Sequence, residues 1–516
     1  MHKMCILSIS TSYFPRRSPI ISRLEIISNE SMVKIYKIHP SIGIARVGNS
    51  PTQFFIGPEI PGVPPMEIVN GQERPLHKYK DKHGLIKRQA ARFRVFEYEQ
   101  NEEGVISSGR EITADEATIE WQVHLVNRKA ASENLNQGVP RDQLIIDPGV
   151  RSICGQQQSV KFHTGKFLGV NVYLGELQTD ASGRLVVLGG RGKSASPNGK
   201  EITGLFSDGW YDDVSDGPVT AKITFPGQRP RQVDNSAWVI VGPPDFAPDI
   251  QGIVTLYDVV NQAAFTSGWY FPPTPPSFKS DIFPILNRAV SLRWVNHWET
   301  WNDALPTDWK KLSDLQDPTA PEMREKIFEF ITFPPLNGVQ LTEVQKSILQ
   351  LWKEGNFIDD WTPDSSNVTL TPENLDRAAL ESCIGSSFAP GIEAGFLITS
   401  PQIYSGYLRL SHQILLPGSL TQGMSLPWQA DFSACGDNWW PSQRPNTVQL
   451  APDYGPPKEL WDAGVADGNG MVQNFSKLGF VVPKQNSVGE VVFVEQERDP
   501  NFPRSALTPK SKAPKY

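Results

Sequence analysis

The sequence predicts an α+β fold, in which a β-rich N-terminal region packs on a mixed α+β C-terminal region through a large interface. Polar and apolar residues alternate, as in half-buried strands, over much of the chain from residue 35 to about 262. Helical spacing and helix-start signals follow the proline cluster at 271–276. These changes divide the chain into a leader at 1–31, a β-rich domain at 32–270, an α+β domain at 277–498 with the candidate site, and a disordered tail at 499–516.

Strand signals dominate the first half of the chain. Alternation is clearest at 92–98, 119–125 and 221–225. The segment 180–183, Asp-Ala-Ser-Gly, lies between two such runs and predicts the turn of a hairpin. The apolar run 237–241 stops at two prolines and predicts a buried strand.

Helix signals dominate the second half. Thr342 and Gln345 form a capping-box pattern ahead of apolar residues at helical spacing. Thr371 followed by a proline predicts the start of another helix, and Gly385 is a natural terminator. A last helix is expected at 471–478.

Charge and hydropathy exclude two classes of partner. The 516 residues carry a formal net charge of −7, whereas a nucleic-acid-binding surface needs a basic face. Lys87, Arg88, Arg92 and Arg94 form a local basic run, but their alternation predicts one solvated strand face rather than an anion site. No stretch approaches the roughly 18 apolar residues of a membrane helix. A soluble protein is expected, either cytoplasmic or secreted by a non-classical route.

The first 31 residues differ from the rest. Their short apolar runs are broken by Pro15-Arg16-Arg17, which fits a signal peptide poorly. The favoured interpretation takes Met32 as the natural start, with a disordered or mis-assigned leader before it. An organellar transit peptide is the alternative.

The segment 428–445 contains the strongest chemical signal. Asp431 precedes the lone thiol of Cys435 by four residues, and the adjacent indoles Trp439 and Trp440 follow. A carboxylate can act as the base that produces a reactive thiolate, and at this spacing the two groups share a helical face, about 5–6 Å apart at Cβ. We therefore expect Asp431 and Cys435 at the floor of an interior pocket, with the two indoles as its wall.

Other candidates carry weaker signals. Cys5, Cys154, Cys383 and Cys435 lie far apart and form neither a zinc pattern nor a disulfide framework, so no metal is expected. For Cys383, core packing is favoured over lining the pocket.

The histidines and one loop allow two interpretations each. His297 and His412 are either substrate or proton-relay residues or, as is commoner, structural donors; His39 is expected to be structural. The loop 208–213 suits a site rim or a domain contact better than core. The chain contains no phosphate loop, HExxH or GxSxG motif.

The thiol segment resembles that of the L-lysine ε-oxidase/glycine oxidase family, whose members carry a cysteine tryptophylquinone. The resemblance extends from about residue 35 to 482 in ordered blocks. These blocks lie at 38–51, 54–59, 80–81, 87–94, 174–177, 183–190, 210–217, 238–248 and 383–393.

The resemblance implies a function and roles for two residues. In that family the thiol of a DxxxC motif attaches to a distant tryptophan, which implies that Cys435 is the thioether sulfur and Asp431 the base. A side-chain quinone offers a carbonyl for condensation with a primary amine, which the twenty ordinary side chains lack. The implied activity is oxidation of an amino acid with release of ammonia and hydrogen peroxide. A flavoprotein maturation partner is also implied, and a homo-oligomer is compatible.

The family's quinone position falls on a phenylalanine. The quinone tryptophan precedes a Leu-Gly-Phe run, and the matching residue is Phe475, which cannot become an indole quinone. Three alternatives stay open: no indole is present, Trp461 serves instead, or Trp439 or Trp440 does. The expectation from this alignment is that Phe475 is the ring nearest the Cys435 sulfur. Without a quinone, the chain would be a binding or structural homologue, or use Asp431 and Cys435 for unrelated acid/thiol chemistry.

Overall fold

The computed structural model describes residues 32–101, 106–296, 305, 307–332, 341–362, 369–385, 394–434, 442–453 and 458–504. The leader at 1–31, most of the predicted tail, Cys435, His297 and the Trp439-Trp440 pair lie outside the described residues.

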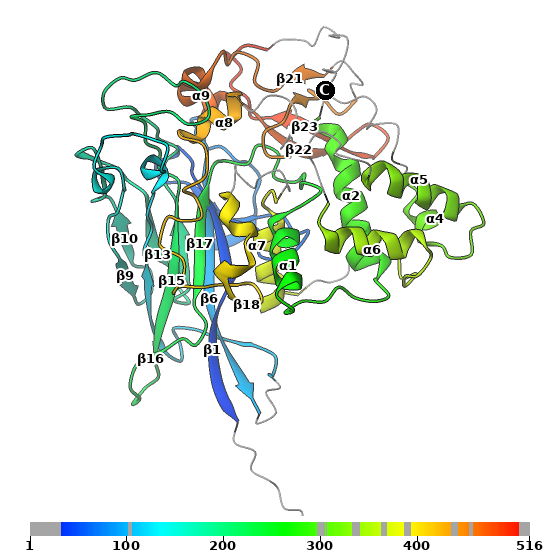
Figure 1. Ribbon diagram of the computed structural model, residues 1–516, viewed down its shortest axis with the longest axis horizontal. Helices are drawn as coiled ribbons and strands as arrows, with labels where there is room; N and C mark the ends of the chain where they lie inside the picture. The colour runs from blue at the N-terminus through cyan, green and yellow to red at the C-terminus, as the bar shows by residue number, and fades with distance from the viewer. Residues whose placement is uncertain are drawn as a thin grey trace, which may run out of the picture.

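One large mixed sheet dominates the N-terminal region (Figure 1). Its main path runs in the order β10 (Ser159–Phe162), β13 (Gly175–Thr179), β14 (Leu185–Leu188), β6 (Arg88–Gln100), β2 (Ile42–Arg46), β17 (Ala237–Gly242), β15 (Ser215–Thr224), β8 (Thr118–Val123) and β9 (Arg151–Cys154). The strands joined to this path are β1 (Val33–His39), β3 (Phe54–Ile56), β4 (Met66–Val69), β5 (Gln72–Pro75), β7 (Arg110–Ile112) and β16 (Arg231–Gln232).

Smaller two-stranded sheets lie outside this sheet. They are β11 (Lys166–Phe167) with β12 (Val170–Asn171), β18 (Tyr404–Gly406) with β19 (Arg409–Leu410), β20 (Thr447–Val448) with β21 (Glu459–Leu460), and β22 (Phe480–Gln485) with β23 (Val491–Gln496).

The strand pairing confirms the predicted hairpin and the buried strand. β13 and β14 pair antiparallel, and between them the Asp180 carboxylate accepts hydrogen bonds from the N–H groups of Ser182 and Arg184. Every residue of β17 is buried, and the strand lies between β15, its antiparallel neighbour, and β2, its parallel neighbour. Apolar side chains on both faces are expected for such a central strand.

The prediction that the basic side chains of β6 line a solvated face is wrong. Arg92 and Arg94 are 4% and 2% exposed, and both donate to the carboxylate of Glu59, which lies in the loop after β3. Burial alone would raise the pKa of Glu59, but these hydrogen bonds lower it to about 2. Lys87 likewise pairs with Glu67 at 2.7 Å. Alternation placed Arg92 and Arg94 on one face correctly, but the carboxylate of Glu59, distant in sequence, covers that face.

Most of the α-helices pack beside the large sheet or farther out from it (Figure 1). α1 (Leu256–Thr266) and α7 (Pro372–Glu381) lie beside the sheet, and the helical group farther out contains α2 (Phe283–Ser291), α4 (Trp309–Ser313), α5 (Ala320–Thr332) and α6 (Glu343–Lys353). The predicted capping box of Thr342 and Gln345 is present at α6, and Thr371 caps α7. Helix formation begins at α1, before the proline cluster.

A third group of elements lies at one end of the sheet (Figure 1). It contains α8 (Trp428–Ala434), α9 (Gly468–Asn474) and the β22–β23 hairpin. One continuous apolar core runs from the strands of the N-terminal region to these elements. The α+β class is therefore confirmed, with the two regions packed directly on each other.

A buried polar network also joins the two regions. His39 Nδ1 lies 3.0 Å from the carboxylate of Asp376 on α7, and its Nε2 lies 3.0 Å from Arg409 and 3.1 Å from the hydroxyl of Tyr98. A guanidinium can only donate, so Nε2 is the acceptor and His39 is neutral with its proton on Nδ1. Burial lowers the pKa of His39, in agreement with this assignment.

Candidate active site

Helix α8 carries the candidate carboxylate. Asp431 is 5% exposed on this helix. Cys435 follows the last residue of α8 in the sequence but lies outside the described residues, so the expected thiol–carboxylate distance stays a prediction. A helix of seven residues is too short to be stable alone and depends on tertiary contacts.

The start of α8 is bound by a buried ion pair from the N-terminal region. Trp428 N–H donates to Asp212 Oδ2 over 2.9 Å. The same carboxylate forms an ion pair with Lys129, and both side chains are 0% exposed. Asp212 belongs to the loop that was expected at a site rim or a domain contact. It makes a domain contact, and it lies in the interior.

The glycine-rich loop 189–194, which follows β14, binds the first turn of α8. Gln429 Nε2 donates to Gly192 O at 3.1 Å, and Ser194 Oγ donates to Gln429 Oε1 at 2.6 Å. Asp213 fixes this loop, because its Oδ2 accepts from the N–H groups of residues 191 and 193 at 2.6 and 3.0 Å. Burial raises the pKa of Asp213 to about 7.

Arg444 binds the other end of α8. Its Nε donates to Phe432 O at 2.6 Å, and its terminal nitrogen contacts Asp462 Oδ2 at 2.6 Å. The guanidinium lies over the ring of Trp461, 5.7 Å from its centroid. Arg444 is only 4% exposed. The helix is therefore fixed at both ends by charged groups withdrawn from solvent.

Two aromatic side chains singled out in the sequence pack on α8 at different turns. Phe475 contacts the ring of Trp428 edge-on, with centroids 5.2 Å apart. Trp461 contacts Phe432 at 6.4 Å, one turn farther along the helix, and donates from Nε1 to Gly479 O at 2.9 Å. Trp461 therefore packs toward the Cys435 end of α8 and Phe475 toward its beginning. The expectation that Phe475 is the ring nearest the sulfur stays a prediction.

Cys383 and His412 contact residues of the large sheet. Cys383 is 2% exposed, and its Sγ lies 3.8 Å from the guanidinium of Arg46 on β2. His412 packs edge-on against Trp238, and its ring lies 3.1 Å from Ala237 O. Both residues lie at contacts between the sheet and the C-terminal region. Their proposed pocket roles stay predictions.

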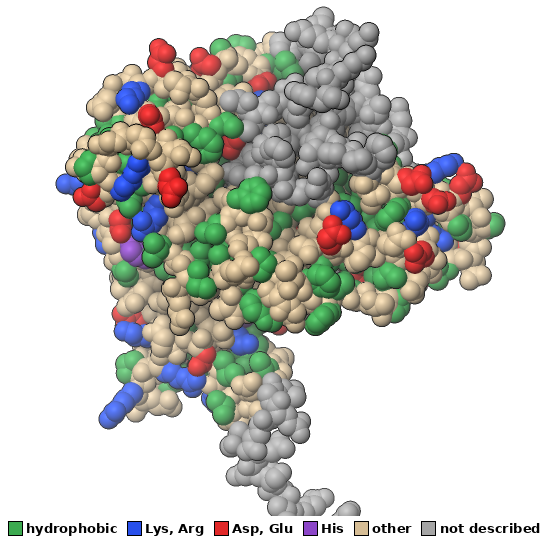
Figure 2. Space-filling view, in the orientation of Figure 1, with side chains coloured by type: hydrophobic (Ala, Val, Ile, Leu, Met, Phe, Trp, Pro, Cys, Tyr) green, Lys and Arg blue, Asp and Glu red, His purple; other side chains and the backbone are tan. Residues whose placement is uncertain are grey.

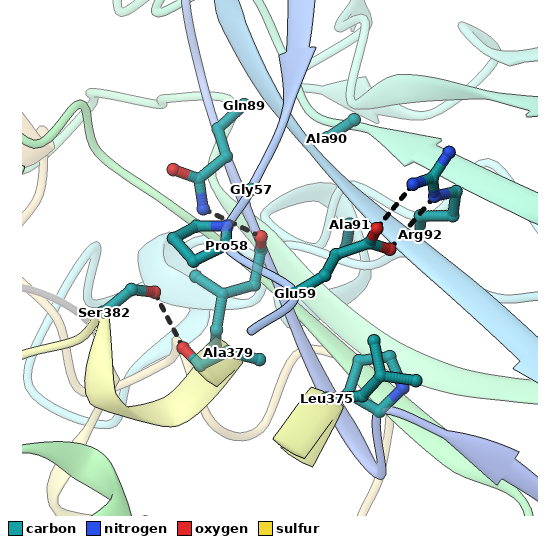
Figure 3. A pocket seen from close by; sticks show the side chains of 12 residues that line it. Gly57, Pro58, Glu59, Gln89, Ala90, Ala91, Arg92, Leu375, Ala379 and Ser382 are labelled. Carbon is teal, nitrogen blue, oxygen red and sulfur yellow. Dashed lines mark hydrogen bonds and ion pairs between the residues drawn. The ribbon is translucent and has the colours of Figure 1, made fainter. Parts of the chain in front are cut away.

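A small cavity lies between β6, the loop after β3 and α7 (Figure 3). Its volume of about 20 Å³ is room for one water molecule. Figure 3 shows the Glu59 carboxylate pointing at Arg92, with Ala90, Ala91 and Leu375 as apolar lining. The cavity includes no residue of α8, so we interpret it as a packing gap between the sheet and α7.

Metal ligands, membrane-spanning helices and surface charge were compared over the described residues. No three His, Cys, Asp or Glu side chains of the described residues converge as a metal site would require. None of the described helices is long and apolar enough to cross a bilayer. On the face shown in Figure 2, positive and negative side chains are interspersed among the coloured residues.

Sequence reasoning identified α8 but missed the residues that bind it. Asp212 and Lys129 are separated from Trp428 by more than 200 residues, so no local pattern relates them. One available signal was the acidic pair Asp212-Asp213 beside large aromatic residues in a polar loop. Another was Arg444, which lies between Pro441 and Pro445 a short way after Asp431 in the sequence.

Two domain families match this chain. Residues 39–241 match the family described as L-lysine epsilon oxidase N-terminal, and residues 332–452 match the L-lysine epsilon oxidase C-terminal domain. Together these matches cover more than half of the chain. The chain is also 28% identical to the L-lysine 6-oxidase of Marinomonas mediterranea over 530 aligned residues, covering 77% of this chain and 70% of the relative.

Solved structures show the same fold. The crystal structure of the Schiff base intermediate of L-Lys epsilon-oxidase from Marinomonas mediterranea with L-Lys superimposes with a TM-score of 0.73 at 23% identity. A second crystal structure of the L-Lys epsilon-oxidase from that organism gives 0.70 at 24% identity. Each comparison covers 90% of this chain and 95% of the other.

Proposed function

Because this chain belongs to the L-lysine ε-oxidase family, we propose that it is an amino-acid oxidase acting on a primary amine. The reaction consumes the amine, oxygen and water, and it releases a carbonyl compound, ammonia and hydrogen peroxide. The observation that carries the proposal is the enclosure of α8. Asp431 is buried on a helix that is fixed at both ends. Cys435, the thiol of the DxxxC motif, follows it by four residues in the sequence.

The proposal includes a cysteine tryptophylquinone built from Cys435 and Trp461. Phe475 does not fit this group, since a phenyl ring has no indole to oxidise. Trp461 fits better, because it is a fully buried indole that packs on Phe432, three residues before Cys435. When present, the quinone supplies a carbonyl with which a primary amine condenses.

The residues around α8 supply the remaining chemistry. Asp431 is the group that accepts a proton, from the Cys435 thiol during maturation and from the substrate carbon next to the amine during turnover. Arg444 fixes the end of α8 that precedes the thiol, through its bond to Phe432 O. Burial of the helix keeps bulk water away from Asp431, which strengthens its electrostatic interactions.

The decisive experiment looks for the quinone and for turnover in the same sample. The protein is produced with a flavoprotein hydroxylase, run on a denaturing gel and stained with a redox-cycling dye. Peptide mass spectrometry then locates any crosslink, and peroxide release is measured with L-lysine, glycine and other amino acids. We expect staining, a crosslink between Cys435 and Trp461, and amine-dependent peroxide. The variant Trp461→Phe should lose all three.

A second candidate function is favoured by Phe475 at the family's quinone position. In that case the chain is a quinone-less homologue that binds an amino acid or serves a structural role. Absence of staining and crosslink in correctly folded protein supports this candidate and contradicts the oxidase proposal. Binding without turnover, followed by calorimetry with the same amino acids, would then define its ligand.

A further inference from the structure

The Lys129–Asp212 pair belongs to the N-terminal region, yet it binds a helix of the C-terminal region. Both side chains have no exposed surface. Such a pair loses the hydration of two charges, so apolar residues of similar size often stabilise a fold as well or better. Stability alone therefore does not explain the pair.

The carboxylate of Asp212 is fixed from several sides. Lys129 and the Trp428 N–H both contact Oδ2, while Asn127 Nδ2 donates to Oδ1 at 2.8 Å. Asn127 is itself held, because Nδ2 also donates to Val214 O at 2.8 Å and Oδ1 accepts from Lys129 N–H at 3.0 Å. The oxygen that receives the Trp428 N–H therefore has a defined position.

We propose that Lys129 and Asp212 are positioning residues that fix where α8 begins, and through this helix the place of the Asp431 carboxylate. The inference rests on the proposed function, since it takes Asp431 and Cys435 as the reacting pair. Asp431 lies three residues after Trp428, within the same helical turn, so any shift of the first turn moves its carboxylate.

The test compares two double variants that both remove the ion pair. K129M/D212N retains one oxygen acceptor for the Trp428 N–H and gives up the acceptor for Asn127 Nδ2, whereas K129M/D212L removes both. The full chain is produced without a flavoprotein partner, so that Cys435 is a free thiol, and is treated with iodoacetamide. Alkylation of Cys435 is followed by peptide mass spectrometry, with the exposed Cys154 and the buried Cys383 as internal controls.

We expect Cys435 in K129M/D212L to react about tenfold faster than in K129M/D212N, the change that loss of one hydrogen bond produces. The pH dependence of the Cys435 rate should also shift in the leucine variant alone, because the Asp431 carboxylate moves with the first turn of α8. The rates at Cys383 and Cys154 should stay at their wild-type values. Equal Cys435 rates in the two variants, an unshifted pH profile, or an acceleration shared by Cys383 would overturn the proposal.

Hydrogen exchange gives a readout that does not use the thiol. Amides of α8 should exchange faster in K129M/D212L than in K129M/D212N, with α7 as the unchanged reference. This measurement holds even if Cys435 is already crosslinked. Neither readout requires amine oxidation, so a protein that fails to release peroxide still tests the positioning role.

Discussion

Replacing Gly192 by alanine tests the placement of the ring at position 475. A Cβ at residue 192 would lie 2.8 Å from Cζ and 3.2 Å from Cε2 of Phe475. Contacts this short cost about 1–3 kcal/mol when the core cannot yield. The backbone at Gly192 has φ of +70°, which costs an alanine about 1–2 kcal/mol more. We expect the free energy of unfolding to fall by about 2–5 kcal/mol in total.

Gly199 provides the matched control. Its φ is +64°, and a Cβ added there meets no atom within 4 Å. Gly199→Ala should therefore show the backbone cost alone, about 1–2 kcal/mol. Urea unfolding followed by tryptophan fluorescence gives both values. The difference between them is the steric cost at Phe475.

A double variant separates this contact from other effects of the loop. Removing the ring by Phe475→Ala should relieve most of the steric cost of Gly192→Ala, so the two changes should be non-additive by about 1 kcal/mol or more. Equal losses for Gly192→Ala and Gly199→Ala, or strictly additive changes with Phe475→Ala, would refute the reasoning. Phe475 would then not pack against the glycine-rich loop.

Three further predictions concern the site ring, the buried charges and pH. Phe475→Trp should lower the free energy of unfolding by about 1–3 kcal/mol through overpacking and should leave the crosslink at Trp461. Peptide mass spectrometry of the stained protein locates the crosslink, and a crosslink at residue 475 would contradict this prediction. Arg92→Met should destabilise by about 2–3 kcal/mol, because it removes one of the two arginine partners of the buried Glu59 carboxylate and leaves Arg94 as the other. Arg110→Met, whose arginine is 55% exposed, should cost less than about 1 kcal/mol, and similar urea midpoints for the two variants would contradict this contrast. Folding lowers the pKa of His39 from 6.5. As the pH falls, the unfolded chain therefore binds the proton before the folded protein does. The stability that neutral His39 contributes is complete above about pH 6.5 and is lost as the pH falls through the lowered pKa. Urea midpoints between pH 7 and 5 should thus fall more steeply for the wild type than for His39→Gln, and parallel slopes would show that His39 does not titrate in this way.

Local patterns predicted those parts of the fold that local physics determines. The hairpin around Asp180 and the capping box of Thr342 depend on residues a few positions apart, and both are present. The same reasoning was wrong for Arg92 and Arg94, because Glu59 covers them from a different strand connection. Alternation shows which side chains share a face of a strand, but it does not predict which residues cover that face.

In the candidate site, too, residues with a local sequence signal were predicted and residues without one were not. The DxxxC pattern singled out α8 and Asp431, because a carboxylate and a thiol at this spacing form a local signal. The start of helix formation at α1 also had such a signal, since Thr255 and Asp258 make a capping box. The contact of Asp212 with Trp428 had none, because it joins segments brought together only by the completed fold.

The parallel pairing of β2 with β17 imposes an order on synthesis. Ile42 pairs with Trp238, so nearly half of the chain must leave the ribosome before the centre of the sheet can close. Loop closure over such a separation is slow, and strand edges stay open to other chains meanwhile. Helix α8 emerges later still and docks on groups that this sheet has already arranged. A C-terminal fragment expressed alone would therefore lack the surface on which its helix forms, whereas the two fragments co-expressed should assemble.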